Sequence, residues 1–192
     1  MRILVLYAHP VETSFCAALH ARVVDTLQAA GHQVDDCDLY AERFDPVLSR
    51  EERLGYHDVP DNRAPVAAHV DRLMAAEALV LVHPVWNFGL PAILKGYLDR
   101  VFLPGISFRM ENGVVAPNLT HIKRITAITT YGGTRFRAWV LGDPPRKIVN
   151  RLLRATAPRA KVKYHALYDM NRNDAGKRQE FLDSIGREME RF

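Results

Sequence analysis

The stretch LVLVHPVWNFGLPAILKGYLDRVF, residues Leu79 to Phe102, decides the fold that the sequence predicts. It begins within a continuous apolar run, Ala78–Val82, which is typical of a parallel strand covered on both faces. Pro84 is predicted to end this strand, and Gly89 and Pro91 are predicted to form the turn into a helix. The loop between strand and helix would therefore lie at the C-terminal end of a buried strand, where open α/β sheets bind their ligands.

Two large aromatic residues in this loop are not explained by folding alone. Trp86 and Phe88 flank Asn87 in a segment that should lie near the surface. They either line a slot for a flat molecule or cover an edge of the core or a dimer contact. The helix that follows is predicted to be amphipathic, because its apolar residues recur at helical spacing: Ile93, Leu94, Tyr97, Leu98 and Val101.

The first thirty residues predict a second loop of this kind. Arg2–Ala8 is predicted to be a strand and Ser14–Ala30 a helix that Gly31 closes. The segment between them brings hydroxyl groups and unpaired backbone N–H groups to a helix N-terminus, which favours an anion such as a phosphate. The alternative is that Thr13 or Ser14 is only an N-cap. The loop has neither a GxGxxG nor a GxxxxGK(S/T) motif. We expect the buried face of the helix to comprise Phe15, Ala18, Leu19, Val23 and Leu27.

A third loop follows another predicted strand, Arg124–Thr130. It reads Tyr131-Gly132-Gly133-Thr134, and its paired glycines allow a close approach of the backbone to a ligand. The remaining segments complete an alternating pattern that predicts an α/β fold: a doubly wound, five-stranded parallel sheet of order 2-1-3-4-5 with helices on both faces, in one domain spanning residues 1–192. They are strands at Gln33–Leu39 and Val162–Tyr168, helices at Pro65–Ala76, Pro144–Ala155 and Asp174–Arg191, a short helical piece near Ser49–Leu54, and a hairpin at Phe108–Val115.

Three segments carry a resemblance to a known family. AHPVETSF at residues 8–15, HPVWNFGLPAILKGYLDRVFLPGISF at 83–108 and TTYGG at 129–133 are similar to the flavodoxin-like NAD(P)H:quinone oxidoreductases. This group includes DT-diaphorase, the modulator-of-drug-activity reductases and the ancillary flavoproteins of potassium efflux systems. The resemblance implies FMN or FAD as cofactor, NAD(P)H as co-substrate, a quinone-like acceptor and a homodimer. It also leaves room for a membrane transporter as partner.

The resemblance assigns roles to positions of this sequence. It implies that the flavin phosphates lie at His9, Thr13, Ser14, Phe15 and Cys16. It implies that Pro84, Val85, Trp86, Asn87 and Phe88 bracket the flavin ring, with Thr130, Gly132 and Gly133 at the ring's polar edge. After the glycine pair, however, DT-diaphorase carries a Tyr and a His that this chain lacks, so we assign no catalytic residue. Arg135 and Arg137 are alternatives for stabilising negative charge on the flavin, or are solvated surface charges.

The function that the sequence predicts is a ping-pong hydride transfer from NAD(P)H through the flavin to the acceptor. An FMN-dependent azoreductase is an alternative, because PVWNFG also resembles the PxYNF loop of those enzymes. A non-enzymatic role is another alternative, either as an electron carrier or as a regulatory flavoprotein subunit of a potassium efflux transporter. A response-regulator receiver is excluded, because the ends of the first and third strands read His9-Pro10 and His83-Pro84 instead of carrying acidic residues.

Composition agrees with a cytoplasmic enzyme. The 192 residues are 48% apolar and 25% charged, and the two cysteines suit a reducing compartment. The eight histidines show no metal-binding spacing, so we predict no metal. Residues 1–100 hold 9 basic and 14 acidic residues, whereas residues 101–192 hold 17 and 8. No aromatic residues interleave the basic cluster at residues 146–163, so we predict no nucleic acid. Attraction of dinucleotide phosphates and a solvated surface remain as explanations of this cluster.

Overall fold

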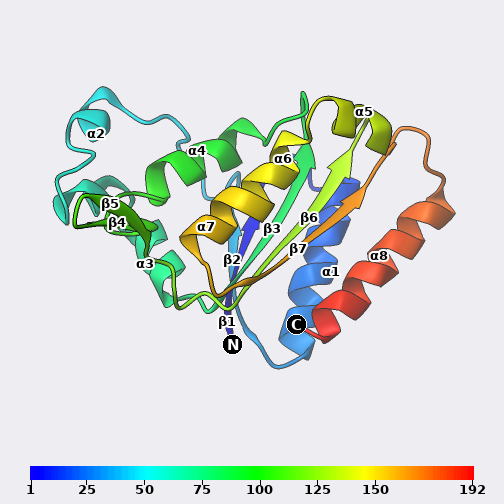
Figure 1. Cartoon of the computed structure of the whole chain (residues 1–192). Helices are drawn as coiled ribbons and strands as arrows, with labels where there is room; N and C mark the ends of the chain where they lie inside the picture. The colour runs from blue at the N-terminus through cyan, green and yellow to red at the C-terminus, as the bar shows by residue number, and fades with distance from the viewer.

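A five-stranded parallel sheet of order β2-β1-β3-β6-β7 forms the centre of the computed structural model, which describes residues 1–192 (Figure 1). Counted without the separate β4–β5 hairpin, this is the predicted order 2-1-3-4-5. The strands are β1 (Arg2–Tyr7), β2 (Gln33–Asp38), β3 (Ala78–Val85), β6 (Arg124–Tyr131) and β7 (Lys161–Leu167).

Helices cover both faces of the sheet, as predicted. On one face lie α1 (Phe15–Ala29) and α8 (Ala175–Glu190), and on the other lie α3 (Ala67–Ala75), α4 (Ala92–Val101) and a continuous helix made of α6 (Pro144–Lys147), η2 (Ile148–Leu153) and α7 (Arg154–Thr156) (Figure 1). The shorter helices are α2 (Arg50–Leu54), η1 (Asp61–Val66) and α5 (Arg135–Val140). No helix has the length and apolar character needed to cross a membrane.

Side chains on alternate sides of the strands form the two layers of the core, one on each face of the sheet. In β1, Leu4 and Leu6 face the larger cluster beneath α3 and α4, whereas Ile3 and Val5 face the smaller cluster beneath α1 and α8. Successive side chains of a strand point to opposite faces, so a strand covered on both sides must be apolar at every position. This explains why all eight residues of β3 are buried.

The prediction that Pro84 ends the third strand is wrong. β3 continues to Val85 and pairs with β6 through Pro84, opposite Thr130. β1 pairs with β3 only as far as Tyr7, opposite Val82, and the N–H of Ala8 then reaches the Val82 carbonyl. Backbone N–H groups point to alternate sides along a strand, so an N–H at position 84 would point to the same side as Val82, towards β1. β1 no longer pairs with β3 at that position. Proline is tolerated there because no partner needs its N–H.

Several helix predictions need correction. The helix predicted from Pro65 begins at Ala67, because the segment containing Pro65 forms the 3₁₀ turn η1. The helix predicted from Pro144 contains the π-helical segment η2, and α5 was not predicted at all. In α1, Ala18 is exposed, and Cys16 is buried in the core.

Other local predictions are confirmed. Ser49 caps α2 in a capping box with Glu52, and Gly31 follows α1 at φ +81°. The hairpin forms as β4 (Phe108–Glu111) and β5 (Val114–Pro117), two residues longer than predicted. Its turn residues, Asn112 and Gly113, both have positive φ, as tight hairpins require.

Gly96 provides a test of the packing between α4 and the loop after β2. A Cβ atom at this position would lie 2.3 Å from both the Cβ and the carbonyl oxygen of Pro46. We expect Gly96→Ala to lower the free energy of unfolding in urea by more than about 2 kcal/mol, because backbone must move to admit the methyl group. Gly176→Ala in α8 is the matched control, since its nearest contact is a side-chain oxygen at 3.4 Å. Equal stability of the two variants would contradict this packing.

Candidate functional site

The carboxyl edge of the sheet has a step. β3 and β6 remain paired for three residues beyond the last β1–β3 pair, through Val85 and Tyr131. The loop after β1 therefore starts lower on the sheet than the loops after β3 and β6. The three predicted ligand-binding loops, after β1, β3 and β6, thus lie along one edge of the sheet.

The first loop leads into α1 with open backbone donors. Ser14 is the N-cap, and its Oγ accepts from the N–H of Ala17 at 3.1 Å. The N–H groups of Thr13, Phe15 and Cys16 have no hydrogen-bond acceptor in the protein. The Cys16 side chain is buried in the core, where burial raises the pKa of its thiol to about 12. Cys16 therefore offers the loop only its backbone N–H, and the helix end can hold an anion.

The aromatic loop is a tight turn with strained backbone. The N–H of Trp86 donates to the Gly89 carbonyl at 3.2 Å, and the reverse bond measures 2.8 Å. The two central residues, Asn87 and Phe88, have φ values of +48° and +55°. The sequence placed the flexibility at Gly89, but the left-handed residues are the two before it. Asn tolerates this conformation, whereas for Phe it is costly, and such strain is concentrated at functional sites.

The three loops contact one another through aromatic rings. The Trp86 ring is 42% exposed, and its centroid lies 5.6 Å from that of His9 at an angle of 59°. Phe88 packs against the third loop, because a Cβ on Gly133 would lie 3.3 Å from the end of its ring. A side chain at this position would press on the Phe88 ring, so the glycine leaves room for the ring. Gly132 is exposed beside it.

The other predicted site residues have different surroundings. The side chains of Pro84, Val85 and Thr130 are buried at the ends of their strands, so Pro84 and Val85 contribute mainly backbone. Thr13 is exposed, and Phe15 is half-buried against the core. The structure thus shows two contacts between these loops, one between the His9 and Trp86 rings and one between the Phe88 ring and the backbone of Gly133.

His83 is fully buried within β3 and is not suited to donate a proton. Its Nδ1 lies 2.9 Å from the Pro84 carbonyl, which makes Nδ1 the protonated nitrogen, and Nε2 has no partner. Burial lowers the pKa of His83 to about 4, although the hydrogen bond to the Pro84 carbonyl opposes this shift. The residue is neutral at pH 7 and acts as part of the core.

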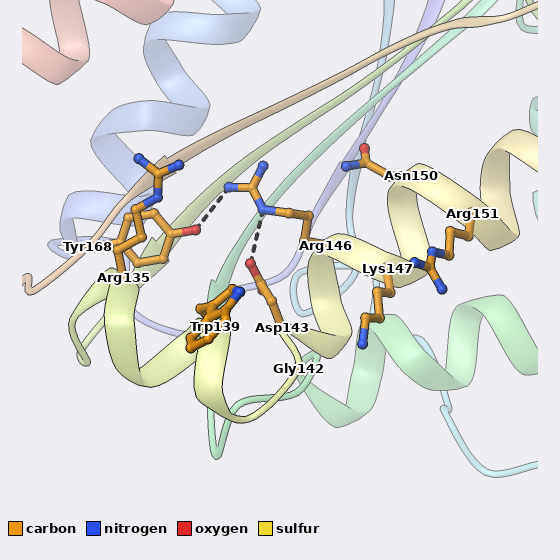
Figure 2. A pocket seen from close by; sticks show the side chains of 9 residues that line it. All are labelled: Arg135, Trp139, Gly142, Asp143, Arg146, Lys147, Asn150, Arg151 and Tyr168. Atoms are coloured by element: carbon orange, nitrogen blue, oxygen red, sulfur yellow. Dashed lines mark hydrogen bonds and ion pairs between the residues drawn. The ribbon is translucent and has the colours of Figure 1, made fainter.

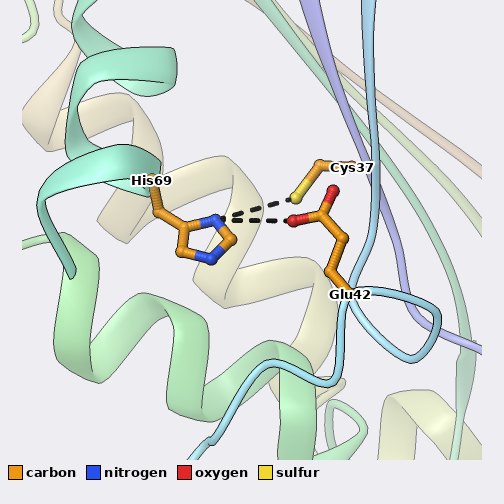
Figure 3. Close-up of side chains that lie close together, drawn as sticks. All are labelled: Cys37, Glu42 and His69. Atoms are coloured by element: carbon orange, nitrogen blue, oxygen red, sulfur yellow. Dashed lines mark hydrogen bonds and ion pairs between the residues drawn. The ribbon is translucent and has the colours of Figure 1, made fainter.

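One group of side chains has donor atoms close enough to hold a metal ion: Cys37, Glu42 and His69 (Figure 3). The His69 Nδ1 lies 4.0 Å from both the Cys37 Sγ and a Glu42 oxygen. Arg72 donates to both Glu42 oxygens at 2.8 Å, and burial raises the pKa of the Cys37 thiol to about 12. A protonated thiol and a carboxylate already paired with arginine account for this group as a hydrogen-bond network.

Comparison with known proteins agrees with this architecture. The family model described as the flavodoxin-like fold matches residues 1–157. The chain belongs to this family of flavodoxin-like proteins. A curated relative, an uncharacterized NAD(P)H oxidoreductase of Haemophilus influenzae, is 38% identical over 59% of this chain and 56% of its own length. NAD(P)H dehydrogenase [quinone] 1 of Cavia porcellus is 31% identical over 68% of this chain and 54% of its own.

The chain spans about half the length of these curated relatives. Among solved flavodoxin-like structures, NAD(P)H:quinone oxidoreductase from Methanothermobacter marburgensis is similar over 99% of this chain and 98% of that chain, with a TM-score of 0.85 and 25% identity. The similarity to that structure includes β7 and α8, which lie beyond the residues matched by the family model.

The strain at Phe88 can be measured by substitution. We expect Phe88→Gly to be more stable than Phe88→Ala by about 1 kcal/mol, because glycine adopts positive φ without a Cβ penalty. Trp86 has no positive φ, so there we expect Trp86→Ala to be more stable than Trp86→Gly. At that position glycine only increases the conformational entropy of the unfolded chain. The measurement is the free energy of unfolding of all four variants. The same order at both positions would argue against strain at Phe88.

The buried His83 predicts a pH dependence of stability. Its pKa is lowered from 6.5 to about 4 in the folded protein, so the unfolded chain binds more protons between these values. The contribution of neutral, buried His83 to the free energy of unfolding is therefore complete above pH 6.5 and is lost as the pH falls towards 4. The loss amounts to about 3 kcal/mol at most. His83→Gln should therefore flatten the fall in unfolding free energy between pH 7 and pH 4.5, with His57→Gln as an exposed control. Equal slopes in the parent and His83→Gln would disprove this.

Proposed function

We propose that the protein is a flavin-dependent NAD(P)H oxidoreductase that delivers a hydride to a quinone-like acceptor. The observation that carries the proposal is the meeting of three loops at one sheet edge: open N–H groups before α1, an exposed indole, and a glycine pair against Phe88. The names of the relatives support the same activity.

The residues present fit a flavin. The N–H groups of Thr13, Phe15 and Cys16 would hold a phosphate with the help of the helix dipole. Trp86 and Phe88 would bracket the ring, and the backbone of Gly132 and Gly133 would face its polar edge. A bound flavin, FMN or FAD, supplies the capacity to accept a hydride from NAD(P)H and to pass it on.

This chain's own contribution is position, shielding and charge. The strained turn places Phe88 against Gly133, and the exposed Trp86 indole offers a flat apolar surface that would form one side of a slot over the bound ring and exclude water there. We propose that donor and acceptor occupy this slot in turn. An azo compound is the alternative acceptor, because a slot shaped for planar molecules does not distinguish it from a quinone.

We propose a homodimer as the active form. The exposed apolar side chains of the β4–β5 hairpin support this, since Met110, Val114 and Val115 are each at least 60% exposed. Apolar side chains gathered on an exposed hairpin favour a protein contact. Sedimentation velocity would measure the oligomeric state, and we expect a dimer for the parent protein. Replacing Met110, Val114 and Val115 by Ser should yield a monomer.

The experiment that tests the proposed function is an absorbance spectrum of the protein incubated with FMN or FAD and freed of excess. We expect flavin bands that bleach with NADPH or NADH and return with a quinone. Trp86→Ala should weaken flavin binding about tenfold, because a stacked aromatic surface is lost. Phe136→Ala on α5 is the control, an aromatic side chain that is 69% exposed outside the three loops. A protein that takes up neither flavin would overturn the proposal.

A further inference from the structure

A strongly basic pocket of about 450 Å³ lies beside the third loop, between α5 and the helix formed by α6 and η2 (Figure 2). Nine residues line it. Four of them are cationic, Arg135, Arg146, Lys147 and Arg151, and a single one, Asp143, is acidic. Arg135 lies at the end nearest Tyr168, whereas Lys147 and Arg151 lie at the opposite end (Figure 2).

One wall of this pocket is held in place by a hydrogen-bond network. The Arg146 Nε donates to Asp143 Oδ2 and its Nη2 to the Tyr168 hydroxyl, both at 2.9 Å. The buried Tyr131 donates to Asp143 Oδ1 at 2.6 Å, and the Arg146 guanidinium lies 4.4 Å from the centroid of the Tyr164 ring. Asp143 is therefore fully engaged within the wall. Its charge compensates Arg146 and leaves the other cations uncompensated.

The three remaining cations have no carboxylate partner. No Asp or Glu oxygen lies within 4.0 Å of the charged nitrogens of Arg135, Lys147 or Arg151, since the pocket's one ion pair joins Arg146 to Asp143. Like charges brought together in a hollow repel one another, so an anion bound among them would be stabilised. Trp139, 73% exposed, adds a flat aromatic face to the same pocket. Cations beside an exposed indole suit a ligand with phosphates and a base.

The backbone around the pocket is also unusual. Gly142 and Asp143 both have positive φ, +80° and +44°. Asn150 and Arg151 enter the pocket from η2, a π-helical segment. Left-handed non-glycine residues and π-helical turns both occur preferentially at functional sites.

The position of the pocket relative to the first loop indicates which ligand it binds. Arg135 follows Gly133 by two residues and lies on the β6–β7 side, whereas the first loop follows β1 on the other side of the aromatic loop. A phosphate held at the N-terminus of α1 would therefore lie on the opposite side of the aromatic loop from this pocket. From these observations we infer that the pocket binds the adenosine diphosphate half of the NAD(P)H donor, with Arg135, Lys147 and Arg151 at its phosphates and Trp139 against its base. This inference rests on the proposed function.

The direct test is calorimetric titration of the protein with ADP-ribose and with its 2′-phosphate, which lack the nicotinamide. We expect saturable binding that weakens with salt, and about a tenfold or greater loss of affinity in the double variant Lys147→Gln/Arg151→Gln. The control is Arg159→Gln/Lys161→Gln, which removes the same charge from exposed positions outside the pocket. No binding by the parent, or equal loss in both double variants, would overturn the inference.

A kinetic test separates this inference from the proposed function. Dihydronicotinamide riboside carries the hydride but no phosphate, so the ratio of kcat/KM for NADPH to that for the riboside should fall about tenfold in Lys147→Gln/Arg151→Gln. An unchanged ratio in a protein whose flavin both donors reduce would overturn the pocket assignment and leave the reductase standing. ADP-ribose binding without flavin reduction by either donor would overturn the reductase and leave an adenosine diphosphate site. A loss of FAD affinity alone would assign the pocket to the cofactor and overturn the inference.

Discussion

The stagger of the central strands is the constraint on which the site depends. β3 is buried along its whole length and pairs with β6 through Tyr131, while β1 leaves the sheet three residues earlier. The main-chain hydrogen bonds between these strands fix the height on the sheet at which each following loop begins. The stagger thus starts the first loop, which leads to the N-terminus of α1, lower on the sheet than the loop that carries Trp86. Because the strands end at different heights, the loops after β1 and β3 begin at different levels of the same edge, which is where we propose that the flavin lies.

The sequence revealed the architecture because parallel strands and amphipathic helices leave local signals. The apolar run at Ala78–Val82 and the helical spacing after Ala92 each depend only on residues close in the chain. The error at Pro84 has a different origin, since the tolerance for proline depends on where β1 stops pairing. Positive φ at Phe88 was equally invisible, because the ring is kept there by its contact with Gly133, which lies 45 residues away. The spacing of residues along a local segment carries no information about contacts with residues that are distant in the sequence.

Tyr131 connects the third loop to the basic pocket. This tyrosine stands between the threonines and glycines of TTYGG, and its side chain points away from the slot to Asp143 and Tyr164, 2.6 Å from each. It joins the end of β6 to the turn before α6. The stretch after the glycines, where the sequence lacks the Tyr and His of DT-diaphorase, here forms α5 and that turn. The residues that replace them build the wall of a basic pocket, which no comparison of single positions would have predicted.

The two halves of the chain separate charge in space as well as in sequence. A hollow of about 550 Å³ near α2 and η1 gathers acidic residues, among them Glu51, Asp58 and Asp61, while the basic pocket lies beside α5 at the far end of the molecule (Figure 1). The net charge of +4 hides this polarity. This separation of charge would steer an anionic ligand towards the basic end, which lies beside the third loop. Because the positive charge is gathered in a pocket and not along a stripe, it matches a compact diphosphate better than the extended backbone of a nucleic acid.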